Sequence, residues 1–123
     1  MKLRIKANTI RLRLTKTEVE QFETGGFVKE SVHFGPGADQ HMHYMIMTEP
    51  GIADLSVDYK NNTLKVLVPG PIAGQWTQTD QVGMEAEVNT GEGLLHILVE
   101  KDFQCLHRDN AEEPDNYAHP LAE

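Results

Sequence analysis

The sequence has few of the features that mark secreted, membrane or disordered proteins. Its 123 residues include a single cysteine, so an internal disulfide is excluded, and no apolar run approaches the roughly 20 residues of a membrane-spanning helix. The first six residues alternate charged and apolar side chains, whereas a signal peptide needs a continuous apolar segment. Aromatic residues are scarce at 7%, but 39% hydrophobic and 24% charged residues are typical of a globular domain. These features predict one cytoplasmic domain without a membrane anchor.

Motifs for catalysis and nucleic-acid binding are missing as well. No Gly-rich phosphate loop, nucleophile elbow or zinc-ligand quartet occurs. The net charge of -8 disfavours a nucleic-acid partner. Cys105 has His107 two residues away, but a reactive thiolate needs a base and an electropositive setting, so a small buried side chain is the favoured interpretation. The sequence therefore identifies no catalytic residue and no cofactor, and a non-enzymatic protein is favoured over an enzyme.

The charge is unevenly distributed along the chain. Residues 1–16 contain six Lys or Arg and no acid, giving +6, whereas residues 17–123 contain five Lys or Arg and 19 acids, giving -14. Cations alternate with apolar side chains in this segment. The apolar residues occupy odd positions in residues 3–5 and even positions in residues 10–14. A regular strand cannot change this alternation, so residues 7–9 must form a bulge or a tight turn. Either solution places five cations on one face of a sheet. This basic face consists of Lys2, Arg4, Lys6, Arg11 and Arg13.

The basic face has two interpretations. Arginine matches phosphate oxygens in a bidentate geometry, so an anionic ligand or an acidic protein segment would suit it. Neutralisation by acids on neighbouring strands is the alternative. The sequence alone leaves both open.

The remaining chain predicts short strands and two helices. Thr15 and Glu18 form a capping box at the start of a helix that Gly25 and Gly26 end, and a second short helix follows Pro69. Strands are expected over residues 2–6, 10–14, 27–34, 41–48, 52–59, 64–68, 82–88 and 94–99.

Short turns join most of these strands and favour antiparallel neighbours. The predicted class is α+β, with a mostly antiparallel curled sheet or partly open barrel of seven to eight short strands and one or two short helices. Residues 1–106 would form a single globular domain, and residues 107–123 an acidic loop or partly disordered tail.

A metal site is a further candidate. Imidazole and thioether groups suit copper, and a strand over residues 41–48 would place several of them on one face, with another histidine across a hairpin. Core packing by methionine is the competing interpretation. The candidate ligands are His33, His41, His43, Met45 and Met47.

Paired carboxylates suggest a second metal chemistry. Glu85 and Glu87, with Glu100 and Asp102, could hold Mg²⁺ or Mn²⁺ beside a phosphate that the basic face binds. This charge pattern resembles that of the triphosphate tunnel enzymes, which implies a phosphate-handling, metal-dependent enzyme. That family opens with E-x-E-x-K, whereas this chain opens with Lys2-x-Arg4-x-Lys6, so the expected glutamates are missing.

Two segments carry a resemblance that spans nearly the whole chain. They read KLRIKxNxIRLRL at the start and LVEKDFxCL from Leu98, with the stretch from Trp76 to Gly83 between them. The chain is similar to a family of small bacterial proteins of unknown function. This resemblance implies a bacterial, cytosolic, single-domain protein, and it transfers no activity or site.

Three functions are therefore carried forward. The leading one is a non-enzymatic binding or interaction module that uses the basic face, with a homo-oligomer among the possible assemblies. The alternatives are the phosphate-handling enzyme and the His/Met metal-binding protein.

Overall fold

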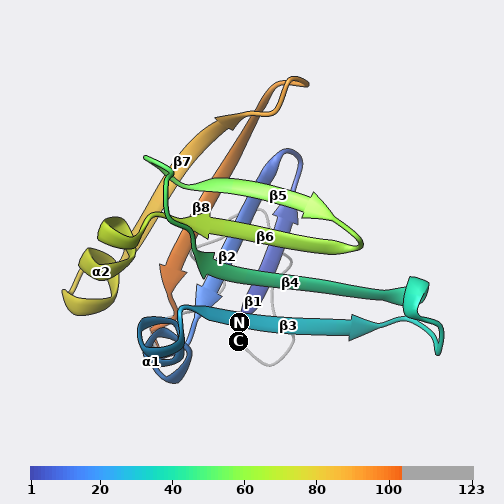
Figure 1. Ribbon diagram of the computed structural model, residues 1–123, viewed down its shortest axis with the longest axis horizontal. Coiled ribbons are helices and arrows are strands. Elements are labelled where there is room, and N and C mark those ends of the chain that lie inside the picture. Colours follow the sequence, from blue (N-terminus) through green and yellow to red (C-terminus); the bar gives the residue numbers. More distant parts are fainter. Residues whose placement is uncertain (104–123) are drawn as a thin grey trace, which may run out of the picture.

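The strands of the computed structural model form two separate four-stranded sheets, and neither sheet closes into a barrel (Figure 1). The structure describes residues 1–103. The first sheet has the order β1 (Lys2–Lys6), β2 (Thr9–Leu14), β8 (Leu94–Lys101), β7 (Gly83–Asn89). The second has the order β3 (Phe27–His33), β4 (His41–Thr48), β6 (Thr63–Val68), β5 (Ser56–Lys60). With the helices α1 (Lys16–Gly25) and α2 (Gly70–Gln78), this confirms the predicted α+β class.

Local signals position most elements as predicted. The hydroxyl of Thr15 accepts the backbone N–H of Glu18, and the carboxylate of Glu18 accepts the backbone N–H of Thr15, which completes the capping box of α1. Gly26 ends that helix with φ of 85°, a conformation that favours glycine. Ala7, with φ of 48°, lies in the tight turn between β1 and β2 that the change of alternation requires. Asn61 and Asn62 also have positive φ in the turn between β5 and β6.

The sheets are mostly antiparallel, as predicted, with one parallel pairing at the centre of each. β2 pairs with β8 in parallel, and β4 pairs with β6 in parallel, whereas all four outer pairings are antiparallel. Each sheet is thus two hairpins that meet through their second strands. Short turns determine the direction of the two strands within a hairpin, which is antiparallel in all four, but they do not determine how two hairpins meet.

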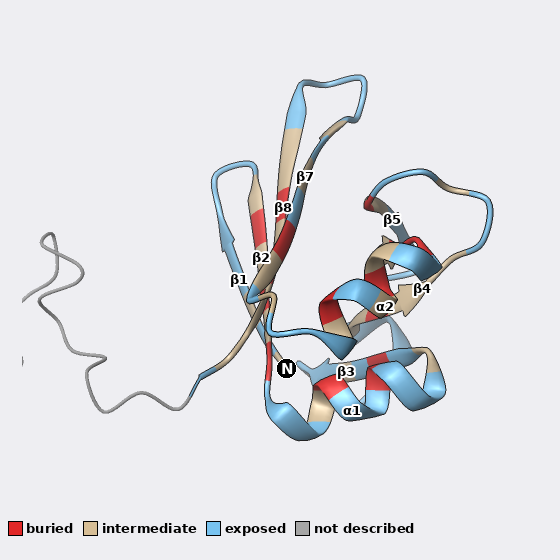
Figure 2. Ribbon diagram, turned by 90° about the vertical axis from the view of Figure 1, so that its left-hand side faces the viewer, coloured by how far each residue is buried: buried red, intermediate tan, exposed pale blue. Residues whose placement is uncertain are grey.

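Two strands also differ in extent or burial. The strand predicted over residues 52–59 begins only at Ser56, and the carboxylate of Asp54 instead accepts the backbone N–H of Leu55 at 2.8 Å. The continuous apolar run of β8, residues 94–99, is typical of a strand buried on both faces. Only its inner side chains, Ile97 and Val99, are fully buried, because no other element of residues 1–103 covers the outer face of the first sheet (Figure 2).

The core lies between the two sheets, whose strands cross at a large angle (Figure 1), and both helices lie at one end of it (Figure 2). Phe22 of α1 and Trp76 of α2 meet edge to face at 6.2 Å, and both are almost completely buried. The indole N–H of Trp76 donates to the carbonyl of Val82 at 2.9 Å, so burial leaves no unsatisfied donor there. Neither helix is long and apolar enough to cross a membrane.

A polar cluster at Met1 connects elements of both sheets. The ammonium group of Met1 contacts the carboxylates of Glu18 on α1 and Glu30 on β3, and the hydroxyl of Tyr44 on β4 donates to the Met1 carbonyl at 3.0 Å. Burial alone would lower the pKa of the ammonium, but hydrogen bonds with Glu18 and Glu30 outweigh it and raise that pKa. Burial likewise opposes the hydrogen bonds that lower the pKa of Glu18. No sequence pattern predicted this cluster.

The Met1 cluster predicts a pH-dependent stability. The raised pKa of the ammonium gives a contribution that is present below about pH 8 and lost as the pH rises through the folded-state pKa. The lowered pKa of Glu18 gives a contribution present above about pH 4.3 and lost as the pH falls through the folded-state pKa. Glu18→Gln keeps a hydrogen-bonding side chain without the charge. The free energy of unfolding of this variant should therefore fall less than that of wild type at both the alkaline and the acidic end of the range. Urea unfolding across this pH range, with Glu20→Gln as the exposed control, measures the effect; curves parallel to wild type would contradict this origin.

Candidate functional site

The outer face of the first sheet brings the five residues of the basic face together. Lys2 lies opposite Arg13, and Arg4 lies opposite Arg11, in the antiparallel pairing of β1 with β2. Directly opposed residues project from the same side of a sheet, so these pairs form two adjacent rows of cations. Lys6 continues the row on β1 towards the hairpin turn. Like charges opposed in this way repel, and the face therefore favours anionic neighbours.

Part of this charge is neutralised by the neighbouring strand β8. The carboxylate of Glu100 accepts hydrogen bonds from Arg11, with its Oε1 at 2.8 Å from Nε and 2.6 Å from the terminal NH2 nitrogen. The same oxygen lies 3.6 Å from Nε of Arg13, and Asp102 lies 3.3 Å from the Lys2 ammonium. These contacts exist because β2 and β8 run in parallel with Arg13 opposite Glu100. Acids on β8 and directly after it thus neutralise part of the basic face.

The cations of the basic face differ in exposure. Arg11 and Arg13 are half-buried beside Glu100, whereas Lys2, Arg4 and Lys6 on β1 are all exposed. β1 is also an edge strand of its sheet. The electrostatic arrangement therefore combines a paired centre with an exposed cationic edge.

The basic face is an open surface, and the nearest cavity touches it only at one end. A cavity of about 810 Å³ lies between α1 and the end of β8, and its walls include Lys2, Leu14, Val19 and Phe103. The other four cations of the basic face do not line it. Alternate residues of a strand lie about 7 Å apart, so the cations on β1 are spread along a line. This spacing suits an extended anion better than a compact one.

The carboxylate candidates do not join the basic face in one concave site. Glu85 on β7 shares a row with Arg11, but Leu98 on β8 lies between them, and the carboxylate of Glu85 pairs with His96 at 2.9 Å. A cavity of about 420 Å³ beside Glu85 is lined by neither Arg11 nor Glu87. Inward charges in a closed tunnel define the triphosphate tunnel enzymes, whereas these charges project from an open sheet.

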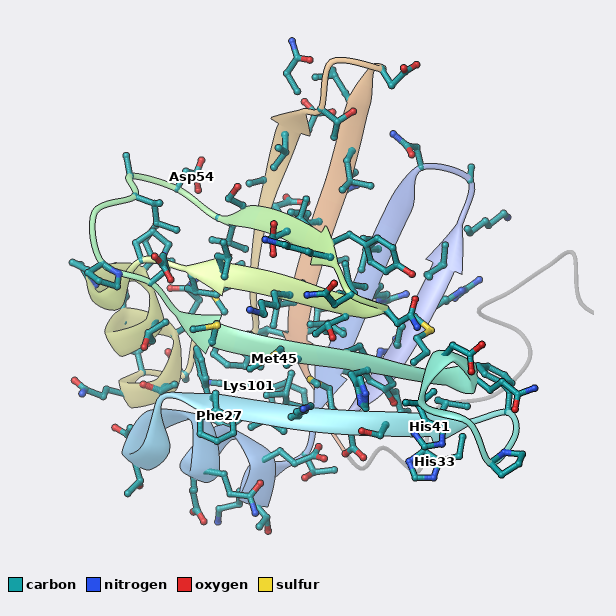
Figure 3. The ribbon with its side chains drawn as sticks, turned by 45° about the vertical axis from the view of Figure 1, so that its right-hand side comes forward. Phe27, His33, His41, Met45, Asp54 and Lys101 are labelled. Carbon is teal, nitrogen blue, oxygen red and sulfur yellow. The ribbon has the colours of Figure 1, made fainter. Side chains whose placement is uncertain are left out.

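The histidine candidates gather at the far end of the hairpin formed by β3 and β4. The rings of His33 and His41 stack with centroids 3.9 Å apart (Figure 3), and Nδ1 of His43 lies 2.6 Å from the hydroxyl of Ser31. Partial burial lowers the pKa of His43, and the charges of Lys29 and the two stacked histidines lower it further.

The methionine candidates lie further along β4. Met45 follows His41 by four residues and Met47 follows it by six, which corresponds to about 13 and 20 Å along an extended strand. Metal-ligand bonds to nitrogen or sulfur are about 2 Å long, so a single ion could not bridge these groups without deforming the strand. Within residues 1–103, no three His, Cys, Asp or Glu side chains are grouped to hold a metal ion. Cys105 lies outside the described residues.

The role of Glu100 gives a stability prediction. Glu100→Gln removes the charge that two half-buried guanidinium groups share, and we expect the free energy of unfolding to fall by about 1 kcal/mol. Glu87→Gln, on the exposed part of the neighbouring strand β7, is the matched control and should change it by less than about 0.5 kcal/mol. Urea unfolding at neutral pH and low salt measures both values. Equal effects of the two substitutions would show that the contact contributes nothing specific.

Comparison with known proteins identifies a family without identifying an activity. No curated protein and no solved structure matches the chain. A model of a family of unknown function, DUF7009, matches residues 1–121, which include the whole of both sheets. This match confirms that the sequence resemblance was to a family of unknown function. The chain belongs to the family of unknown function DUF7009.

Proposed function

We propose that the protein is a non-enzymatic binding module whose basic face receives an acidic segment of a partner protein. The observation that supports this most directly is the row of exposed cations on an edge strand. Arg11 and Arg13 are held by Glu100 beside β8, while Lys2, Arg4 and Lys6 are exposed on β1. An acidic partner would relieve the repulsion between the opposed pairs on β1 and β2.

The shape of the surface favours an extended partner over a compact anion. The cations of β1 follow one another at every second residue and are not gathered in a cavity. A polypeptide in the extended conformation presents alternate side chains to one face at the same spacing of about 7 Å. An acidic strand could therefore match Lys2, Arg4 and Lys6 residue by residue.

The edge of β1 offers a second means of recognition. Its outer edge pairs with no strand of the described chain, so its backbone groups are placed for strand addition. Lysine on an edge strand ordinarily discourages pairing with other chains. These cations would repel a basic strand and attract an acidic one. The same side chains would therefore select partners by their charge.

Location and assembly belong to the same proposal. We place the protein in the bacterial cytoplasm, where its single cysteine would remain reduced. Its acidic partner is another protein, and a homo-oligomer in which a neighbouring copy supplies the acids is the alternative that sedimentation velocity would detect.

A peptide-binding measurement tests the proposal. A fluorescein-labelled peptide of ten glutamates is titrated with the protein at low salt, and its fluorescence anisotropy is recorded. We expect the double variant Arg4→Gln with Lys6→Gln to bind about three- to tenfold more weakly than wild type, since two exposed charges are lost. The matched control is Lys60→Gln with Lys65→Gln on the second sheet, which should bind like wild type.

Three results would contradict the proposal. Peptide binding that is absent, or that added salt leaves unchanged, would exclude an electrostatic site. Equal weakening by the control would show that overall charge and not the basic face determines binding. Tighter binding of inorganic triphosphate than of the peptide would favour a compact anionic ligand.

A further inference from the structure

The described chain ends beside the basic face. After β8, the backbone N–H of Asp102 donates to the carbonyl of Leu14 at 2.8 Å, and the Asp102 carboxylate lies 3.3 Å from the Lys2 ammonium. Phe103 is the last described residue and lines the same cavity as Lys2. The following segment, residues 104–123, is therefore covalently attached at the Lys2 end of the basic face.

The composition of residues 104–123 is complementary to that face. The segment contains five acids and one arginine, and four of the acids fall within seven consecutive positions. These four, named here the acidic cluster, are Asp109, Glu112, Glu113 and Asp115. Opposite charges on one chain attract most strongly where the connection between them is short.

The connection is long enough for contact. Asp109 lies six positions after Phe103, and six extended residues span up to about 20 Å. The five residues of β1 cover about 17 Å. The acidic cluster can therefore reach any cation of the basic face. The match to the family model extends to residue 121, so the family includes this segment together with the two sheets.

We infer that the acidic cluster of residues 109–115 binds the basic face of its own chain and competes with external acidic partners. This inference rests on the proposed function, because it assigns an internal competitor to the same site. Tethering gives the cluster an effective concentration in the millimolar range, whatever the protein concentration. An external partner then binds with an affinity reduced by the fraction of molecules whose face is occupied. Only a strongly acidic or multivalent partner would then bind tightly enough to displace the segment.

The test uses the full chain with the acidic cluster neutralised. The variant carries Asp109→Asn, Glu112→Gln, Glu113→Gln and Asp115→Asn. Its matched control removes four exposed acids from other parts of the molecule, through Glu23→Gln, Asp39→Asn, Asp58→Asn and Glu92→Gln. Both variants change the net charge by the same amount, so their comparison separates the position of the acids from their number. Binding of the labelled ten-glutamate peptide is measured by anisotropy, and backbone amide shifts are recorded by NMR without peptide.

We expect the cluster variant to bind the peptide about three- to tenfold more tightly than wild type, and the control to gain less than twofold. Without peptide, the cluster variant should shift amide resonances in β1 and β2 that the control leaves in place. Equal gains in both variants, or no gain in either, would overturn the inference while leaving the proposed function intact.

Two further results separate the alternatives. If no protein binds the peptide but the cluster variant still shifts the β1 and β2 amides, the internal contact stands and the proposed external partner is wrong. If neither binding nor shifts are seen, both are wrong. Sedimentation velocity should show a wild-type monomer at the concentrations used. An oligomer that the cluster variant lacks would assign the contact to a neighbouring copy and overturn the same-chain inference.

Discussion

The parallel pairing of β2 with β8 is the constraint on which the first sheet and its outer surface depend. It joins a hairpin from the start of the chain to one from the end of the described region. On the inner side it aligns Leu12 with Val99 in the core, and on the outer side it aligns Arg13 with Glu100. A shift of one residue would exchange these two faces and place charges in the core. The same register therefore maintains both the packing and the partial neutralisation.

The basic face combines that internal neutralisation with a row of exposed cations on the edge strand. Arg11 and Arg13 lie beside β8 and find Glu100, whereas β1 is one strand further away, at the edge. Carboxylates on β7 lie beyond Leu98 and are separated from the cations by a whole strand. The order of strands thus grades the outer face from cationic at β1 to acidic at β7. Such a gradient suits recognition by charge, and it does not assemble the convergent groups that phosphate chemistry would require.

Local elements of the fold were predictable because their causes lie within a few residues. The capping box at Thr15, the end of α1 at Gly26 and the positive φ at Asn61 each depend on side chains near the element itself. The start of the strand at Ser56 was missed because alternation continues through residues 52–55, where Asp54 instead stabilises a bend. The contacts of Met1 with Glu18, Glu30 and Tyr44 reach three elements and leave no signal at any one position.

The sequence by itself determined that five cations share one face of a sheet, because strict alternation and the single change of parity at residues 7–9 allow no other arrangement. It also determined both ends of α1, the start of α2 and the α+β class. Only the tertiary structure decided which acids approach those cations, since Glu100 lies 87 residues after Arg13 and reaches it through a parallel pairing that no local pattern encodes. The separation of the sheets, and with it the absence of a tunnel, was likewise decided by how the hairpins pack around Phe22 and Trp76. Local periodicity fixes the face of a residue, whereas its neighbours on that face depend on long-range packing.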